Sequence, residues 1–161
     1  MLKKQDVSLE QATAGLPIAS NPCITALHNK AIQSGLIPFG TKSSKKPDYY
    51  KIEYKKSKKD SPIYVLTVKG EKWDLKCKLF HLDKYVALLY KLSESALHDI
   101  LMSRECRGPE RGCIVGVKFK VNEKSYNLCR HGIFFRQLVL EDVEDVWALM
   151  KAEIFERAEQ N

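Results

Sequence analysis

The sequence lacks the features that would place it in a membrane or on a secretory route. None of its apolar runs approaches the length of about 20 residues that a membrane-spanning helix needs. The N-terminal stretch MLKKQDVSLEQ has no apolar central region of the kind that signal peptides carry. We therefore expect a soluble, intracellular protein, cytoplasmic or nuclear, with no membrane partner.

Motifs for catalysis or metal binding are also scarce. The chain has no Walker loop, no HExxH segment and no paired-carboxylate signature. Its five cysteines are an odd count in a chain without a signal, which favours reduced thiols. Cys106, Cys113, Cys129 and His131 could supply four zinc ligands, but their spacing is wider than that of usual structural zinc sites. Cys129 and His131 could also form a nucleophile–base pair, for which the sequence locates no orienting group. We expect no enzymatic activity, no metal and no cofactor.

The charge of the chain is positive and unevenly distributed. The formal net charge is +7 at pH 7. Residues 112–136 carry five Lys/Arg against one acid, whereas residues 137–161 carry seven acids against two basic residues. A positive balance of this size predicts attraction to polyanions, although it predicts no fold.

Residues 1–47 are typical of a flexible leader that contains one short helix. Asn21 and Pro22 suit the start of a helix and Gly35 suits its end, which predicts a helix over about 22–34. The basic, turn-rich stretch GTKSSKKPD (40–48) is typical of a linker. We expect the folded domain to span residues 48–161.

The pattern of residues 48–161 predicts the same order of elements twice. In each case three strands are followed by a helix. In the first set, 48–104, the alternating stretches YYKIEYKK, IYVLTVKG and KWDLKCKLF precede helical spacing that runs for about five turns from Asp83. In the second set, 112–161, CIVGVKFKV, YNLCRHG and IFFRQLVL precede a helix that opens at Glu141. A fourth short strand could lie at 79–82 and at 137–140. The pattern predicts an α+β fold of two pseudo-repeats, βββ(β)α twice, after the N-terminal helix.

The two sets can be aligned with each other. At an offset of 62 residues YVLTVKG aligns with YNLCRHG, and at an offset of 58 residues Asp83 aligns with Glu141. Strand-rich segments followed by amphipathic helices also resemble each other by chance. The shared order and the matched start of the helix favour a duplication.

These stretches carry a family resemblance. YYKIEYKKSKKDSPIYVLTVKG followed by CKLFHLDKYVALLYKL is similar to a Pur-type repeat, and VGVKFKVNEKSYNLCRHGIFFRQLVLEDVEDVWALM resembles a second one. Roughly residues 48–161 thus resemble the Pur-alpha, Whirly and positive-cofactor-four group of single-strand nucleic-acid binders. The sequence departs from the Pur pattern at EKW and at Cys129–Arg130–His131. The resemblance implies binding of single-stranded DNA or RNA on exposed sheet faces, in transcription or replication.

The residue chemistry independently favours the same function. Phosphates need cations along a track and unpaired bases need flat rings to stack on, and the predicted strands carry both. The alternative is that the lysines are merely solvated and the aromatic residues belong to the core. The candidate nucleic-acid-binding residues are Lys51, Lys55, Tyr64, Lys76, Lys78, Lys118, Lys120, Arg130, Phe134 and Arg136.

A second function class remains open at this point. The order of helices and strands also resembles small dimeric α/β protein-binding modules, such as secretion chaperones, and effectors that block another protein. The surfaces of such chaperones are usually acidic, so the net charge of +7 counts against them. Unpaired sheet edges would allow a homodimer in either class.

Overall fold

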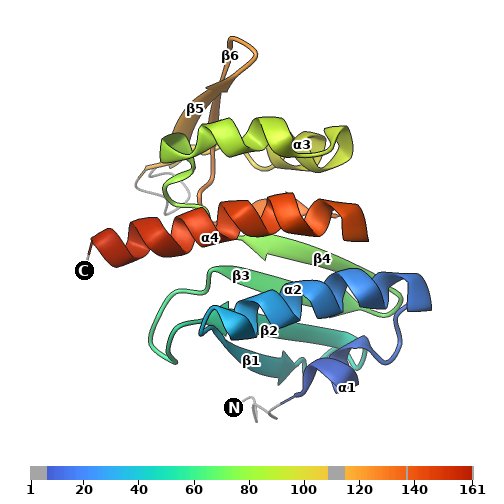
Figure 1. The fold of residues 1–161 in the computed structure, drawn as a ribbon. Helices are drawn as coiled ribbons and strands as arrows, with labels where there is room; N and C mark the ends of the chain where they lie inside the picture. Colours follow the sequence, from blue (N-terminus) through green and yellow to red (C-terminus); the bar gives the residue numbers. More distant parts are fainter. Residues whose placement is uncertain (1–6, 109–114, 137, 161) are drawn as a thin grey trace. The chain divides into compact units, whose positions relative to one another are not determined.

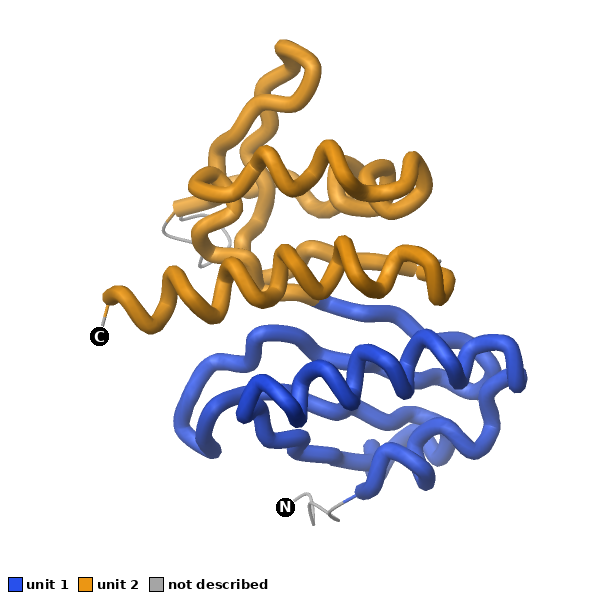
Figure 2. The backbone as a smooth tube through the Cα atoms, viewed as in Figure 1, with its two compact units in different colours: residues 1–76 blue, residues 77–161 orange. Residues whose placement is uncertain are grey.

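A computed structural model describes residues 7–108, 115–136 and 138–160. The chain forms two compact units, residues 1–76 (unit 1) and residues 77–161 (unit 2), which Figure 2 colours separately. Both helices and strands are present, which confirms the predicted α+β class. In the described ranges, no helix combines the length and the apolar character that crossing a bilayer requires.

Unit 1 is a helical segment followed by a sheet. The helices are α1 (Leu9–Thr13), the 3-10 turn η1 (Ile18–Ser20) and α2 (Asn21–Gln33). The strands are β1 (Ile37–Lys42), β2 (Tyr49–Lys55), β3 (Tyr64–Lys69) and β4 (Lys72–Cys77), adjacent in that order. β2 is antiparallel to both β1 and β3, and the two-residue connection from β3 to β4 makes a hairpin. Figure 1 shows α2 lying across the sheet.

The core of unit 1 lies between α2 and one face of this sheet. Tyr54 on β2 and Tyr64 on β3 pair directly, and their rings stack at 4.3 Å. The Tyr64 hydroxyl donates to the Leu27 carbonyl on α2 (3.2 Å), and His28 Nδ1 lies 2.9 Å from the Tyr54 hydroxyl. Tyr64 is 1% exposed. Its assignment to a binding surface is therefore corrected, since its ring belongs to the core.

Strand β1 lies in the segment that was expected to be leader and linker. Pro38 and Gly40 both disfavour a strand interior, which is why the sequence pattern hides it. Pro38 is tolerated because β1 is the end strand of the unit 1 sheet, where a missing N–H donor leaves no neighbouring strand unpaired. A Cβ at Gly40 would overlap the carbonyl oxygen of Val7, so only glycine fits where that segment crosses β1.

Unit 2 begins with short helical turns. They are η2 (Leu82–Lys84) and η3 (Val86–Lys91), which are 3-10 helices, followed by α3 (Glu94–Leu101). Next come β5 (Val117–Val121), β6 (Lys124–Leu128) and β7 (Ile133–Phe135), and then the 3-10 turn η5 (Leu140–Asp142) and α4 (Val143–Glu159). β5 and β6 form an antiparallel two-stranded ribbon, which extends beyond α3 in Figure 1. β5 packs on η2 and η3, α3 packs on β7, and α4 packs on η3.

Three strands followed by helical segments occur twice, but an unpredicted strand, β1, directly precedes the first set. β2, β3 and β4 precede η2, η3 and α3, and β5, β6 and β7 precede η5 and α4. The turns η2 and η5 begin at Leu82 and Leu140, 58 residues apart, as in the sequence alignment. The described residues of 79–82 and 137–140 form no strand. The boundary between the two compact units falls after Lys76, inside the first set.

The prediction of one five-turn helix that starts at Asp83 is wrong. Leu92 and Ser93 are extended, with ψ angles of 150° and 156°, and they separate η3 from α3. The Ser93 hydroxyl accepts a hydrogen bond from the Ala96 N–H (3.1 Å), so Ser93 starts a new helix as its N-cap. The apolar spacing still marks buried positions, since Leu89, Ala96 and Ile100 all lie in the core.

Candidate functional site

The sheet face of unit 1 opposite the Tyr54–Tyr64 core carries a mixture of lysines and aromatic rings. Strand alternation and the observed register place side chains from β1, β2 and β3 on this side. Val65 and Thr67 in its centre are buried, and the others are partly or fully exposed. We call this surface the lysine face, and it consists of Ile37, Phe39, Thr41, Tyr49, Lys51, Glu53, Lys55, Val65, Thr67 and Lys69.

Two lysines of the lysine face lie over aromatic rings. The Lys55 Nζ is 4.9 Å from the centre of the Phe39 ring, and the Lys69 Nζ is 5.4 Å from the centre of the Tyr49 ring. The second contact follows directly from the register, because Tyr49 pairs with Lys69 across β2 and β3. Each contact places a cation beside a flat apolar ring. A cation can meet a phosphate and a ring can stack with a base, which are the two kinds of contact that single-strand binders use.

Glu53 is the acid of the lysine face. Its carboxylate accepts from Lys51 (2.7 Å) and from Lys55 (3.0 Å). Burial raises the pKa of Glu53, but the hydrogen bonds and charges of the two lysines outweigh burial and lower it to about 2. Glu53 is therefore ionised at neutral pH and offsets one lysine charge, so that Lys51, Lys55 and Lys69 together leave the face positive.

The net positive charge of the chain is located entirely in unit 1. Residues 1–76 contain 14 Lys/Arg and 7 Asp/Glu, whereas residues 77–161 contain 13 of each. The connections between strands contribute strongly, since the exposed residues Lys45 and Lys46 follow β1 and Lys56, Lys58 and Lys59 follow β2. Unit 1 thus carries the charge that would attract a polyanion.

The β5–β6 ribbon of unit 2 carries two further candidates. Lys118 and Lys120 are exposed while Val117, Phe119 and Val121 are buried, as the alternation predicts. Neither lysine forms an ion pair with a described residue. The two lysines help to line a surface depression of about 400 Å³, together with Glu105, Phe119, Ser125, Tyr126 and Asn127.

Three further candidates form cation–ring contacts in unit 2. Phe134 is half-buried and Arg136 is exposed, with the Arg136 guanidinium 5.8 Å from the Phe134 ring centre. The Arg130 guanidinium lies 5.1 Å from the Phe80 ring centre. Of the ten candidates, four lie in unit 1 (Lys51, Lys55, Tyr64, Lys76) and six in unit 2 (Lys78, Lys118, Lys120, Arg130, Phe134, Arg136). The lysine face unites Lys51 with Lys55, and the ribbon unites Lys118 with Lys120.

The ten candidates from the sequence omit three residues of the lysine face that form its cation–ring contacts, Phe39, Tyr49 and Lys69. Phe39 lies in β1, which the pattern assigned to the leader, so no strand phase was available for it. Lys69 closes β3, and its contact with Tyr49 depends on the pairing register of two strands. The alternation of YYKIEYKK was the available signal, because it places Tyr49 on the same side as Lys51 and Lys55.

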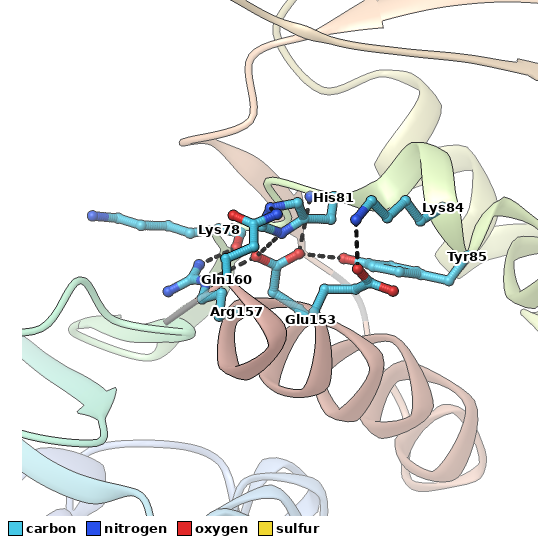
Figure 3. Close-up of polar contacts among 8 residues, drawn as sticks. Lys78, His81, Lys84, Tyr85, Glu153, Arg157 and Gln160 are labelled. Atoms are coloured by element: carbon cyan, nitrogen blue, oxygen red, sulfur yellow. Dashed lines mark hydrogen bonds and ion pairs between the residues drawn. The ribbon is translucent and has the colours of Figure 1, made fainter.

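Unit 2 contains a second polar site around a buried carboxylate (Figure 3). Glu153 on α4 is 0% exposed. Its Oε2 accepts from the Tyr85 hydroxyl (2.7 Å) and the His81 backbone N–H (3.0 Å). Its Oε1 accepts from Arg157 Nε (2.7 Å) and lies 3.2 Å from His81 Nδ1. We call Glu153, His81, Tyr85 and Arg157 the Glu153 cluster.

The Glu153 cluster is internally satisfied. Four donors meet the two carboxylate oxygens, and Arg157 also donates to the Lys78 carbonyl. Burial raises the pKa of the Tyr85 hydroxyl, and the negative charge of Glu153 raises it further. The Tyr85 hydroxyl thus stays protonated and donates. These contacts attach the end of α4 to residues 78–85, which is a structural role that needs no substrate.

The described residues contain no group of three His, Cys, Asp or Glu side chains placed to hold a metal ion. Of the four zinc-ligand candidates, Cys113 lies outside the described residues, and Cys106 and Cys129 are free thiols. Comparisons of the chain with models of protein families, with curated proteins and with solved structures each return no match.

Proposed function

We propose that the protein binds single-stranded nucleic acid on the lysine face of unit 1. The observation that carries this proposal is the pairing of cations with rings on that face, Lys55 at Phe39 and Lys69 at Tyr49. This face belongs to the unit that holds the whole net charge of the chain. A sheet face with cations and rings suits a strand whose bases are unpaired, because the backbone contacts the cations while the bases stack on the rings.

Each part of the face has a separate task in this proposal. The lysines of the two connections attract the strand over a distance of about one Debye length. Lys51 and Lys69 then contact phosphates, and each contact releases counterions from the strand. Tyr49 and Phe39 offer ring surfaces on which bases can stack, which contributes about 1–3 kcal/mol per base. None of these contacts reads the edge of a base, so we expect weak sequence preference.

The test is the salt dependence of binding to a labelled single strand of about 20 nucleotides, longer than the roughly 4–16 nucleotides that one small binding fold typically covers. Fluorescence anisotropy at several salt concentrations gives the slope of log K against log salt. We expect affinity to fall steeply with salt. The double variant Lys51→Gln with Lys69→Gln should reduce the slope by about 1.4, because each phosphate contact of a single strand contributes about 0.7.

Lys118→Gln with Lys120→Gln provides a charge-matched comparison. It removes the same two charges, but from the β5–β6 ribbon of unit 2. We expect this variant to change the slope less than the variant of the lysine face does. A larger effect of the ribbon variant would move the binding surface to unit 2. Absence of binding by the unaltered chain at low salt would refute the proposed function and favour a protein-binding module.

A further inference from the structure

Three cationic or ionisable side chains of unit 2 surround one aromatic ring. The Arg157 guanidinium lies 4.4 Å and the Arg130 guanidinium 5.1 Å from the centre of the Phe80 ring. The His131 ring meets the same ring edge-on, with centres 4.9 Å apart. We call Phe80, Arg130, His131 and Arg157 the Phe80 cluster. It includes Arg130 and His131 of the Cys–Arg–His stretch that departs from the Pur pattern.

The two arginines of the Phe80 cluster differ in their partners. Arg157 donates to Glu153 and to the Lys78 carbonyl, so its charge is balanced within the protein. Arg130 forms no ion pair with a described residue, and its Nε is buried without a hydrogen-bond partner. The charge of Arg130 is therefore not balanced by a described carboxylate. Glu153 cannot balance it, because Glu153 is 0% exposed and already meets four donors.

We propose that the Phe80 cluster binds a phosphoryl group through Arg130. The planar guanidinium presents donors in a fork that matches two phosphate oxygens. Since the Nε of Arg130 is covered, the phosphate oxygens would meet its Nη groups. Contact with Phe80 holds the plane of the guanidinium in place before the ligand arrives, which lowers the entropic cost of binding. The exposed ring of His131 stands beside the same phenyl ring.

This site is separate from the lysine face, because every residue of the Phe80 cluster belongs to unit 2. The phosphoryl group could come from free phosphate or from the phosphorylated end of a nucleic-acid strand. Both present the same oxygens to Arg130, and the experiment distinguishes them.

The first measurement is a titration of the full-length protein with inorganic phosphate, followed by the phosphorus NMR signal. We expect binding by the unaltered chain and a loss of about tenfold or more in affinity for Arg130→Met, which keeps the aliphatic stem but removes the fork. Arg130→Lys keeps the charge without the fork, so its affinity should be intermediate. Circular dichroism of both variants establishes that they fold.

The control is Lys42→Met. It also removes a cation that lies over a ring, since the Lys42 Nζ is 5.3 Å from the Tyr50 ring centre, but it does so in unit 1. We expect unchanged phosphate affinity. The proposal is overturned if the unaltered chain does not bind phosphate, or if Arg130→Met binds it as well as the unaltered chain does.

Oligonucleotides with and without a 5′-phosphate identify the source of the group. A preference for the phosphorylated strand that disappears in Arg130→Met assigns the site to a strand end, and equal affinity for both strands assigns it to free phosphate. Lys51→Gln with Lys69→Gln should leave binding of inorganic phosphate intact. Failure of the Phe80 cluster is therefore distinguishable from failure of the lysine face.

Discussion

At the scale of single residues, Glu153 shows how a charge can be used for structure. The Glu153–Arg157 pair has helical spacing of four residues, which is usually typical of a solvated surface pair. Here the carboxylate is fully buried and receives donors from residues 81 and 85, about 70 positions away in the sequence. No sequence signal separates the two cases, because the buried environment depends on where the segment containing His81 packs.

The buried position of Glu153 leads to a stability prediction. Glu153→Gln leaves the Arg157 charge without its counterion in a half-buried site, and breaking a buried pair in this way costs about 3–5 kcal/mol. We expect the free energy of unfolding to fall by about 3 kcal/mol, measured by urea denaturation with circular dichroism.

Glu156→Gln is the matched control for this change. Glu156 lies on the same helix and its carboxylate accepts from Lys84 at 2.7 Å, but the Lys84 side chain is 48% exposed. Exposed pairs contribute little to stability, so this variant should be nearly as stable as the unaltered chain. Equal losses for the two variants would contradict the account of the Glu153 cluster.

Residue-level predictions from the sequence were right where one face of a strand is apolar and the other is polar. Ile133 and Phe135 are buried while Phe134 and Arg136 are more exposed, as the alternation predicts. The interpretation was wrong for Tyr64, because residues 64–68 of β3 are all buried and the strand has no polar phase. A fully buried strand gives no sign of which side a tyrosine faces.

At the scale of elements, local capping overrides apolar spacing. The spacing from Tyr85 to Ile100 suits one helix, yet Ser93 ends one helical segment and begins the next. Serine is among the residues that most favour the N-cap position, so Ser93 was a recognisable candidate for the start of a helix. The strand β1 was missed for a different reason, since Gly40 is required by the approach of Val7 from a distant part of the sequence.

The Ser93 cap leads to a second stability prediction. Ser93→Ala removes the acceptor for the Ala96 N–H, which should destabilise the protein by about 1 kcal/mol. Ser95→Ala is the control, because Ser95 is exposed inside α3 and alanine has the higher helix propensity. We expect its stability to be unchanged or slightly raised in the same urea titration. A loss at Ser95 as large as that at Ser93 would indicate that the hydroxyl of Ser93 is not the cap.

At the scale of the whole molecule, the repeated order of elements and the compact units follow different boundaries. The order of three strands and a helix was predictable, because periodicity reports each element separately. The division after Lys76 was not, because strand pairing depends on contacts that periodicity does not contain. The distribution of net charge was unpredictable for the same reason. The excess of positive charge in unit 1 becomes apparent only when charged residues are counted on each side of Lys76. The resemblance to Pur-type proteins stays a prediction.

The cysteines offer a measurement that covers both units. Cys23 on α2 belongs to unit 1 and is 2% exposed, and Cys77, the first residue of unit 2, is 0% exposed. Burial raises the pKa of the Cys77 thiol, which keeps it protonated and unreactive at neutral pH. Cys106 and Cys129 are half-exposed. Under native conditions iodoacetamide should therefore label Cys106 and Cys129 quickly and the two buried thiols slowly.

Mass spectrometry of the labelled peptides, with increasing urea, extends this prediction to unfolding. Labelling of Cys23 then reports the opening of unit 1, because α2 must leave the sheet before its thiol is exposed. Labelling of Cys77 reports the loss of the end of β4. Both rates should rise only as the protein unfolds, since a buried thiol reacts from the open state. Labelling of Cys77 in native buffer as fast as that of Cys106 would contradict the burial of β4.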